Sequence, residues 1–215
     1  MIPHKHAVVF STLLAVSALA VNFAACIYGN NYLPIVFFCL YFILNIGYSM
    51  GLKNIPLLDI VILVSGFLIR TIYGAILTDI QISNWLYLFV VFTAFFLGFG
   101  KRRNELKKSD VISSRPKKKN YPYSFLDKNM YISMALVIVF YTLWTMDSST
   151  IMAYHNNALV WTVPVIVIIL MKYSLTIEGN SDGDPVEVFF KDKALICLSL
   201  IYVVIMLFIL YVFKG

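Results

Sequence analysis

Seven apolar stretches of this chain are each long enough to cross a lipid bilayer as a helix, and this feature limits the fold more than any other. A helix needs about 20 residues, within a range of roughly 17–25, to cross the hydrocarbon layer. The stretches are residues 7–28, 32–48, 55–77, 83–100, 130–146, 158–177 and 194–213. We therefore predict an all-α, polytopic membrane bundle of seven transmembrane helices, forming one domain over residues 1–215.

The composition supports a lipid-facing surface. Hydrophobic residues make up 60% of the chain and charged residues only 13%. A soluble domain carries about 25% charged residues, so a soluble chain of this length would need roughly twice as many. The apolar side chains are therefore expected to face lipid as well as to fill a core.

The Lys and Arg residues indicate an orientation in the membrane. When the connections are numbered alternately, the N-terminus and the connections near 51–54, 101–128 and 178–193 share one side. Of the 17 Lys and Arg residues, only Arg70, Lys172 and Lys214 lie elsewhere. Cytoplasmic loops carry an excess of Lys and Arg. We predict a multi-pass protein of the cell membrane (inner or plasma membrane) with a cytoplasmic N-terminus and an external C-terminus.

The connection at 101–128 is a basic cytoplasmic loop by this reading, and two parts of it differ. Lys117, Lys118 and Lys119 need no explanation beyond attraction to anionic lipid. The cations at Lys101, Arg102 and Arg103 follow the fourth span without a Gly or Pro after Gly100. We expect the helix to continue there and to hold these cations in a fixed geometry at the membrane surface.

One cation lies where a charge is costly. Arg70 is about 15 residues into the third span, and Asp59 precedes it by three helical turns, so the two share a face. At about 16 Å apart along the axis they cannot pair directly. We expect both to line one polar cavity open to the cytoplasm; the alternative is an Arg satisfied by carbonyl groups of a broken neighbouring helix.

The last cytoplasmic connection contains the sequence DGDPVEVFFKD at 182–192. Asp184 suits a helix N-cap, Pro185 the first helical position, and Glu187 the third position of a capping box. Metal binding by Asp182 and Asp184 is the alternative.

Cations and carboxylates thus collect at the cytoplasmic ends of several spans. Cations bind phosphate oxygens, and carboxylates hold Mg²⁺, which bridges diphosphates. Such a site beside lipid-facing helices suits a substrate with an anionic head and a long apolar tail. We expect membrane lipid as a partner and no nucleic acid.

Four motifs make the chain resemble the UbiA superfamily of intramembrane prenyltransferases. They are YSMGLKNIPLLDIVILVSGFLIRTIYGAI at 48–76, GKRRNEL at 100–106, YSFLD at 123–127 and GDPVEVFFKD at 183–192. Together they resemble the branch of polyprenyl-phosphate phosphoribosyltransferases, also called decaprenyl-phosphate phosphoribosyltransferases. The resemblance implies transfer of phosphoribose from phosphoribosyl pyrophosphate to a polyprenyl phosphate, with Mg²⁺. The lipid product would feed arabinose donors for cell-envelope polysaccharide.

The resemblance also assigns candidate site residues. We expect Arg70, Lys53 and Lys101 to act in catalysis by neutralising phosphate charge. The expected phosphate-binding set is Tyr48, Lys53, Arg70, Lys101, Arg102 and Arg103. The family's second acidic motif, D-x-x-x-D, is reduced here to Tyr123 and Asp127. Asp127 is then the best candidate for a Mg²⁺ ligand, with Asp59 a weaker one; Asp127 alternatively caps a helix that starts near Lys128.

The family fold has nine helices, and its first acidic motif, N-D-x-x-D-x-x-x-D, does not occur in this sequence. The seven spans match family helices three to nine. We therefore expect the chain to lack the first hairpin and to be inactive alone. Three explanations stay open: a truncated gene product, a wrongly placed start codon, or a split enzyme in which a separate polypeptide carries the missing two helices. The alternatives are a non-catalytic lipid-binding or transporter-like remnant, or an enzyme that transfers a prenyl group to another acceptor.

Overall fold

The computed structural model describes residues 4–29, 31–112, 121–155, 157–179 and 184–211. Lys117–Lys119 and Asp182, which were considered above, lie outside these ranges. The described elements are α1 (His4–Gly29), α2 (Leu33–Met50), η1 (Leu52–Asn54), α3 (Leu58–Thr78), α4 (Asn84–Ile112), α5 (Tyr123–Met146), α6 (Ser148–Tyr154), η2 (Ala158–Thr162), α7 (Val163–Glu178), α8 (Pro185–Lys191) and α9 (Lys193–Tyr211).

The prediction of an all-α bundle with seven spans is confirmed. By length and composition, seven helical segments of the described chain are long and apolar enough to cross a membrane. No strand occurs within the described ranges. The protein is therefore a multi-pass membrane protein.

Two helices next to the basic connection are longer than the apolar pattern suggested. α4 runs twelve residues past Gly100 to Ile112, and α5 begins at Tyr123 instead of Met130. Neither extension contains a Gly or Pro, and Pro122 at the N-cap of α5 adopts an extended conformation (φ −66°, ψ 136°). The expected continuation of the fourth helix is thus present, and much of the region 101–128 is helical.

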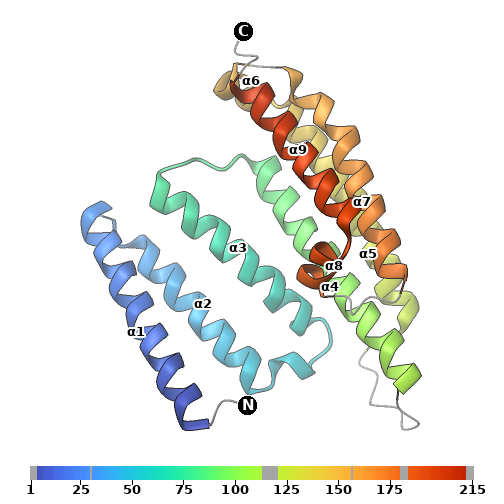
Figure 1. Ribbon diagram of the computed structural model, residues 1–215. Coiled ribbons are helices and arrows are strands. Elements are labelled where there is room, and N and C mark those ends of the chain that lie inside the picture. The colour runs from blue at the N-terminus through green and yellow to red at the C-terminus, as the bar shows by residue number, and fades with distance from the viewer. Residues whose placement is uncertain (1–3, 30, 113–120, 156, 180–183, 212–215) are drawn as a thin grey trace.

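The helices are arranged around α4. In Figure 1, α1, α2 and α3 lie in sequence on one side of α4, and α5, α7 and α9 lie on the other. The buried core gathers side chains from α3, α4, α5, α7, α8 and α9, and contains none from α1 or α2 among the described residues. Only 11% of the α1 span and 6% of the α2 span are buried. These two helices therefore expose most of their apolar surface to the membrane.

Close packing brings α4, α5 and α7 together just before the cations. A Cβ atom added to Gly100 would lie 3.3 Å from Ile177 Cδ1 and 3.5 Å from Met130 Sδ. Ile177 and Met130 are themselves fully buried. The small residue therefore lets the end of α4 approach α5 and α7, which brings the next residues within reach of side chains on both.

Candidate phosphate-binding site

Three consecutive cations of α4 contact different neighbours at one end of the bundle. Successive residues of a helix point about 100° apart, so Lys101, Arg102 and Arg103 cannot share one direction. Lys101 pairs with a residue that caps α8, Arg102 with a residue of α3, and Arg103 with residues of α5 and α7. Through these salt bridges the cations connect α4 to α3, α5, α7 and the N-cap of α8.

Arg102 is held by three groups. Its Nε lies 2.7 Å from Asp59 Oδ2, its Nη1 lies 2.5 Å from Glu105 Oε2, and its Nη2 donates a 2.9 Å hydrogen bond to the Tyr48 hydroxyl. Asp59 is only 3% exposed. A buried carboxylate requires such a partner, because removing an unpaired charge from water is costly.

Tyr121 completes the surroundings of Asp59. Its hydroxyl donates to Asp59 Oδ1 and accepts a hydrogen bond from the backbone N–H of Leu57. Leu57 has a left-handed conformation (φ 67°) just before α3 begins. Burial, together with the hydrogen bond to Asp59, raises the pKa of Tyr121 to about 12. The phenol therefore stays protonated at neutral pH and fixes both Asp59 and the start of α3.

Arg103 is the most deeply buried of the three cations, with 3% of its surface exposed. Its Nε lies 2.7 Å from Asp127 Oδ1, its Nη2 donates to Glu178, and its guanidinium lies 5.2 Å from the centre of the Tyr123 ring. The next residue, Asn104, donates a 2.8 Å hydrogen bond to the carbonyl of Ile177. This pair of residues fixes α4 against α5 and α7.

Lys101 is more accessible. Its Nζ lies 2.9 Å from Asp184 Oδ2, and the two side chains are 36% and 42% exposed. Asp184 also accepts a 3.0 Å hydrogen bond from the N–H of Val186, as a helix N-cap does. The hydrogen bond from Lys101 lowers the pKa of the Asp184 carboxyl. An exposed pair of this kind is weak, so Lys101 can exchange Asp184 for another anion.

The structure brings together most of the residues that the sequence singled out. Tyr48, Asp59 and Arg102 form one group, and Asp127 contacts Arg103. Lys53, in η1, is exposed and makes no salt bridge within the described ranges. The N-cap role of Asp184 with Pro185 at the first helical position is confirmed, whereas Glu187 pairs with Lys191 along α8.

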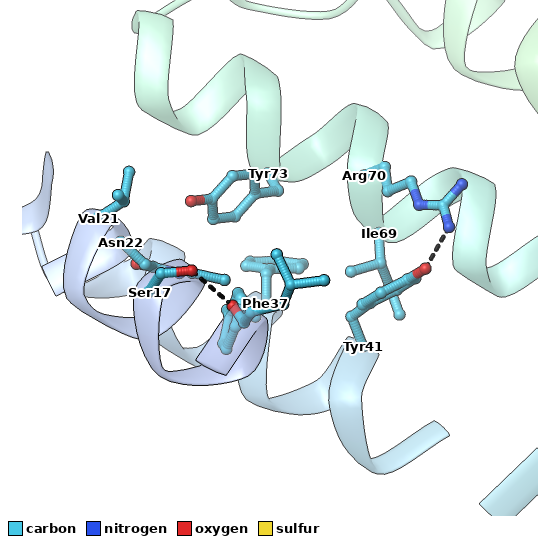
Figure 2. Close-up of a pocket in the computed structure, with 11 residues that line it drawn as sticks. Ser17, Val21, Asn22, Phe37, Tyr41, Ile69, Arg70 and Tyr73 are labelled. Carbon is cyan, nitrogen blue, oxygen red and sulfur yellow. Dashed lines mark hydrogen bonds between the residues drawn. The ribbon is translucent and has the colours of Figure 1, made fainter. Parts of the chain in front are cut away.

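Two expectations are wrong. Arg70 and Asp59 do not line one cavity. Arg70 lines a pocket between α1, α2 and α3 (Figure 2), whereas Asp59 forms a salt bridge with Arg102 of α4. The buried carboxylate pairs with the cation within reach, which leaves Arg70 with Tyr41. Asp127 does not cap a helix near Lys128, because α5 already begins at Tyr123.

The carboxylates differ in their suitability for Mg²⁺. No group of three His, Cys, Asp or Glu residues within the described part of the chain could hold a metal ion. Both oxygens of Asp59 are engaged by Arg102 and Tyr121, so it does not fit a metal ligand. The Asp127 side chain is 33% exposed and contacts Arg103 through Oδ1. Since Mg²⁺ often uses one or two carboxylates plus substrate phosphates, Asp127 fits a single ligand of such an ion.

Sequence reasoning missed three contributors to this site. Glu105 had a local signal, because it lies three residues after Arg102 on the same helix face. Glu178 directly follows the sixth apolar stretch and pairs with Arg103 across 75 positions. Tyr121 follows a polar connection, and nothing in its neighbourhood indicated contact with Asp59.

These features define an all-α, multi-pass membrane protein with a network of cations and carboxylates at one end of its bundle. No family model matches the chain. Three curated proteins named decaprenyl-phosphate phosphoribosyltransferase are similar to it, and they confirm the resemblance that the motifs indicated.

The similarity extends over most of the chain. The chain is 30% identical over 211 residues to the protein from Mycolicibacterium smegmatis. The matched region covers 94% of this chain and 65% of the relative. The relative from Corynebacterium glutamicum is 29% identical, with 80% and 52% covered. The relative from Mycobacterium tuberculosis is 26% identical, with 76% and 54% covered. The chain therefore spans between about half and two thirds of the length of these relatives.

Proposed function

We propose that the chain carries the phosphate-binding part of a membrane phosphoribosyltransferase that acts on a polyprenyl phosphate. The observation that carries the proposal is the agreement between the names of the relatives and the cation network of α4. A transferase of this kind must hold several phosphate groups beside lipid. Lysine and arginine side chains at the end of a transmembrane helix provide that chemistry.

The proposed site lies at the cytoplasmic surface of the cell membrane, because nearly all Lys and Arg residues share that side of the predicted topology. A water-soluble sugar diphosphate reaches such a site from the cytoplasm. The polyprenyl chain remains in the bilayer with its phosphate at the surface. The two substrates can therefore meet beside the cations of α4 while the sugar diphosphate stays in water and the polyprenyl chain stays in the bilayer.

The accessibility of the cations assigns different roles to them. Lys101 and Lys53 are the exposed or half-exposed cations, so they are proposed to bind phosphate oxygens directly. Arg102, together with Tyr48, is proposed to bind phosphate as well, once Arg102 releases the Glu105 carboxylate in exchange for a phosphate oxygen. Arg103 is buried against α5 and α7 and is proposed to position the site. Arg70 lies eleven residues from Asp59, about 16 Å along α3, and is not included.

The proposed reaction is attack by a phosphate oxygen of the polyprenyl phosphate on the anomeric carbon of phosphoribosyl pyrophosphate. The new carbon–oxygen bond forms as the bond to pyrophosphate breaks, and pyrophosphate leaves. Negative charge grows on the leaving group, so cations fixed beside it stabilise the transition state more than the ground state. A Mg²⁺ ion held with the help of Asp127 would neutralise part of the same charge.

A transfer assay tests the proposal. The full chain is reconstituted in vesicles with polyprenyl phosphate and radiolabelled phosphoribosyl pyrophosphate, and label entering the organic phase is counted. The assay is repeated with a co-expressed two-helix polypeptide bearing the N-D-x-x-D-x-x-x-D motif. We expect transfer of label to the lipid in the second arm only. In that arm, Lys101→Ala should lower the rate of transfer at least tenfold.

The matched control is Lys191→Gln, which removes an exposed cation of α8 that pairs within its own helix. It should transfer label at the rate of the unchanged chain. The proposal would be overturned if neither arm produced lipid-linked label while the protein still showed a normal thermal transition. If the chain instead passed a polyprenyl group to a different acceptor, its function would be that of a prenyltransferase.

A further inference from the structure

A second site lies away from the charged end, in a pocket between α1, α2 and α3. Its volume is about 500 Å³, within the range of about 300–1,000 Å³ typical of small-molecule sites. Leu14 and Val21 of α1 line the pocket and are 54% and 70% exposed. The pocket therefore reaches the lipid-facing surface of the bundle, so a molecule can enter it from the bilayer.

Arg70 supplies one cation to the pocket. It lies near the middle of the α3 span Leu58–Thr78. Figure 2 shows its guanidinium beside Tyr41 of α2, to whose hydroxyl Nη2 donates a hydrogen bond, and its Cζ lies 4.8 Å from the ring centre. No carboxylate lines the pocket among the residues that the structure describes. A cation near mid-membrane is costly without an anionic partner, so the pocket has one positive charge to be balanced.

Among the other polar groups of the pocket, Asn22 and Tyr41 offer donors, whereas the Ser17 hydroxyl donates to the carbonyl of Leu14. Asn22 is 4% exposed, its Oδ1 accepts from the Cys26 thiol at 3.3 Å, and its Nδ2 has no acceptor among the residues that the structure describes. Tyr41 accepts from Arg70, so its own O–H remains able to donate. Tyr73 projects from α3 towards α1 in Figure 2 and adds a second phenol. A ligand that satisfies these groups must offer hydrogen-bond acceptors.

We propose that this pocket binds a long-chain monocarboxylic acid, with the carboxylate at Arg70 and the hydrocarbon tail along the apolar wall. A carboxylate matches the single guanidinium in charge and can accept two parallel hydrogen bonds from it. A phosphate monoester carries up to two charges and would leave one unpaired in a low-dielectric site. A transmembrane helix is 10–12 Å wide with its side chains, which is too wide for a pocket of this volume.

This site is separate from the phosphate-binding site. Arg70 and Asp59 are eleven residues apart, which is about 16 Å along α3. Asp59 already pairs with Arg102. A ligand in the pocket can therefore bind whether or not the chain transfers phosphoribose, and its test does not depend on the proposed function.

Binding is measured on the full chain in phosphatidylcholine nanodiscs with radiolabelled palmitic acid, and hexadecanol serves as the uncharged probe of equal length. A photoactivatable palmitic acid identifies the labelled peptides. We expect palmitate to bind at least tenfold more tightly than hexadecanol, and crosslinks to map to α1, α2 and α3. Arg70→Gln should reduce palmitate binding to the level of hexadecanol, and Arg70→Lys should retain an intermediate affinity.

Asn22→Leu serves as a control within the pocket, because it removes an amide that lies across the pocket from Arg70 and leaves the cation. It should leave palmitate binding tighter than hexadecanol binding. Lys191→Gln should have no effect on either probe. The proposal would be overturned if palmitate and hexadecanol bound with equal affinity, or if Arg70→Gln left the affinity for palmitate unchanged. It would also be overturned if the crosslinks mapped only to other helices, or if a polyprenyl phosphate bound more tightly at the same peptides.

Discussion

Arg103 Nε lies 2.7 Å from Asp127 Oδ1, and this contact joins α4 to the first turns of α5. The same guanidinium donates to Glu178 at the end of α7. One buried cation therefore holds three transmembrane helices in register. The exposed cation two residues earlier, Lys101, is left to contact the outside of the bundle through Asp184.

Replacing Arg103 by Gln should destabilise the bundle. Asp127 would lose Arg103, Glu178 would keep only the hydrogen bond from the Tyr131 hydroxyl, and breaking a buried ion pair costs about 3–5 kcal/mol. Asp127 and Glu178 are 33% and 38% exposed at their side chains, so we expect about 3 kcal/mol. That corresponds to a fall in Tm of about 6–12 °C for a chain of this size.

The measurement is thermal unfolding of the detergent-purified protein. Lys191→Gln is its control, and an exposed pair of that kind should change stability by less than about 1 kcal/mol. A Tm for Arg103→Gln within 2 °C of the unchanged chain would contradict the positioning role of Arg103.

Tyr121→Phe should destabilise the protein by about 1–3 kcal/mol, the usual cost of leaving buried polar groups without a partner. Asp59 would lose the phenolic donor and the Leu57 N–H would lose its acceptor. The cost should appear as a lower Tm at neutral pH. A Tm equal to that of the unchanged chain would show that water replaces the phenol.

The pH dependence of the same variant gives an independent test. The pKa of Tyr121 is raised from 10.0 to about 12 in the folded protein. A raised pKa contributes stability that is fully present below the unfolded value and is lost as the pH rises from about 10 through 12. Tyr121→Phe should flatten the Tm between pH 10 and 12, and an unchanged slope would argue against this assignment.

Lys101 and Asp184 should have opposite effects on anion binding. Lys101→Gln removes a phosphate-binding cation and should weaken binding of inorganic pyrophosphate about tenfold. Asp184→Asn removes the competing carboxylate that lies 2.9 Å from Lys101 Nζ, and should strengthen binding severalfold. Isothermal titration of pyrophosphate into the purified chain measures both. Changes of the same sign in the two variants would contradict an exchange of partners at Lys101.

Asp192 should control part of the acid stability. Its carboxylate accepts from Lys172 Nζ at 2.8 Å and from Thr176 Oγ1 at 2.6 Å, and these contacts lower its pKa from 3.8 to about 2. A lowered pKa contributes stability above the unfolded value that is lost as the pH falls through the folded value. The contribution is on the order of 1 kcal/mol after discounting for solvent screening.

Asp192→Asn should therefore lower the Tm near neutral pH and flatten its fall between pH 4 and 2. The matched control is Asp79→Asn, because Asp79 is exposed and occupies a left-handed position that Asn also accepts. Equal acid profiles for Asp192→Asn and the unchanged chain would contradict the ion pair with Lys172.

The apolar stretches were sufficient to predict the number of transmembrane helices. A bilayer imposes one length on every spanning helix, and backbone groups in lipid must be satisfied within the segment. The same local logic predicted the continuation of α4 past Gly100 and the cap formed by Asp184 with Pro185. Each of these depends on residues that are close together in the chain.

The partners of the charges could not be predicted in this way. Tyr121 contacts Asp59 across 62 positions, and Lys101 contacts Asp184 across 83. Such pairs depend on which helices are neighbours and how each is rotated, and the apolar pattern of a lipid-exposed helix carries little information about either. The structure accordingly corrected the expectation that Asp59 and Arg70 line one cavity.

The sequence by itself determined the class of protein, its seven spans, its family resemblance and the residue types at its charged end, because these follow from local hydrophobicity and short motifs. Only the tertiary structure decided which of those cations is buried and which can reach a ligand. Burial depends on the packing of α4 against α5 and α7, and a guanidinium enclosed there is held by its carboxylates, whereas an amine at the rim can exchange them.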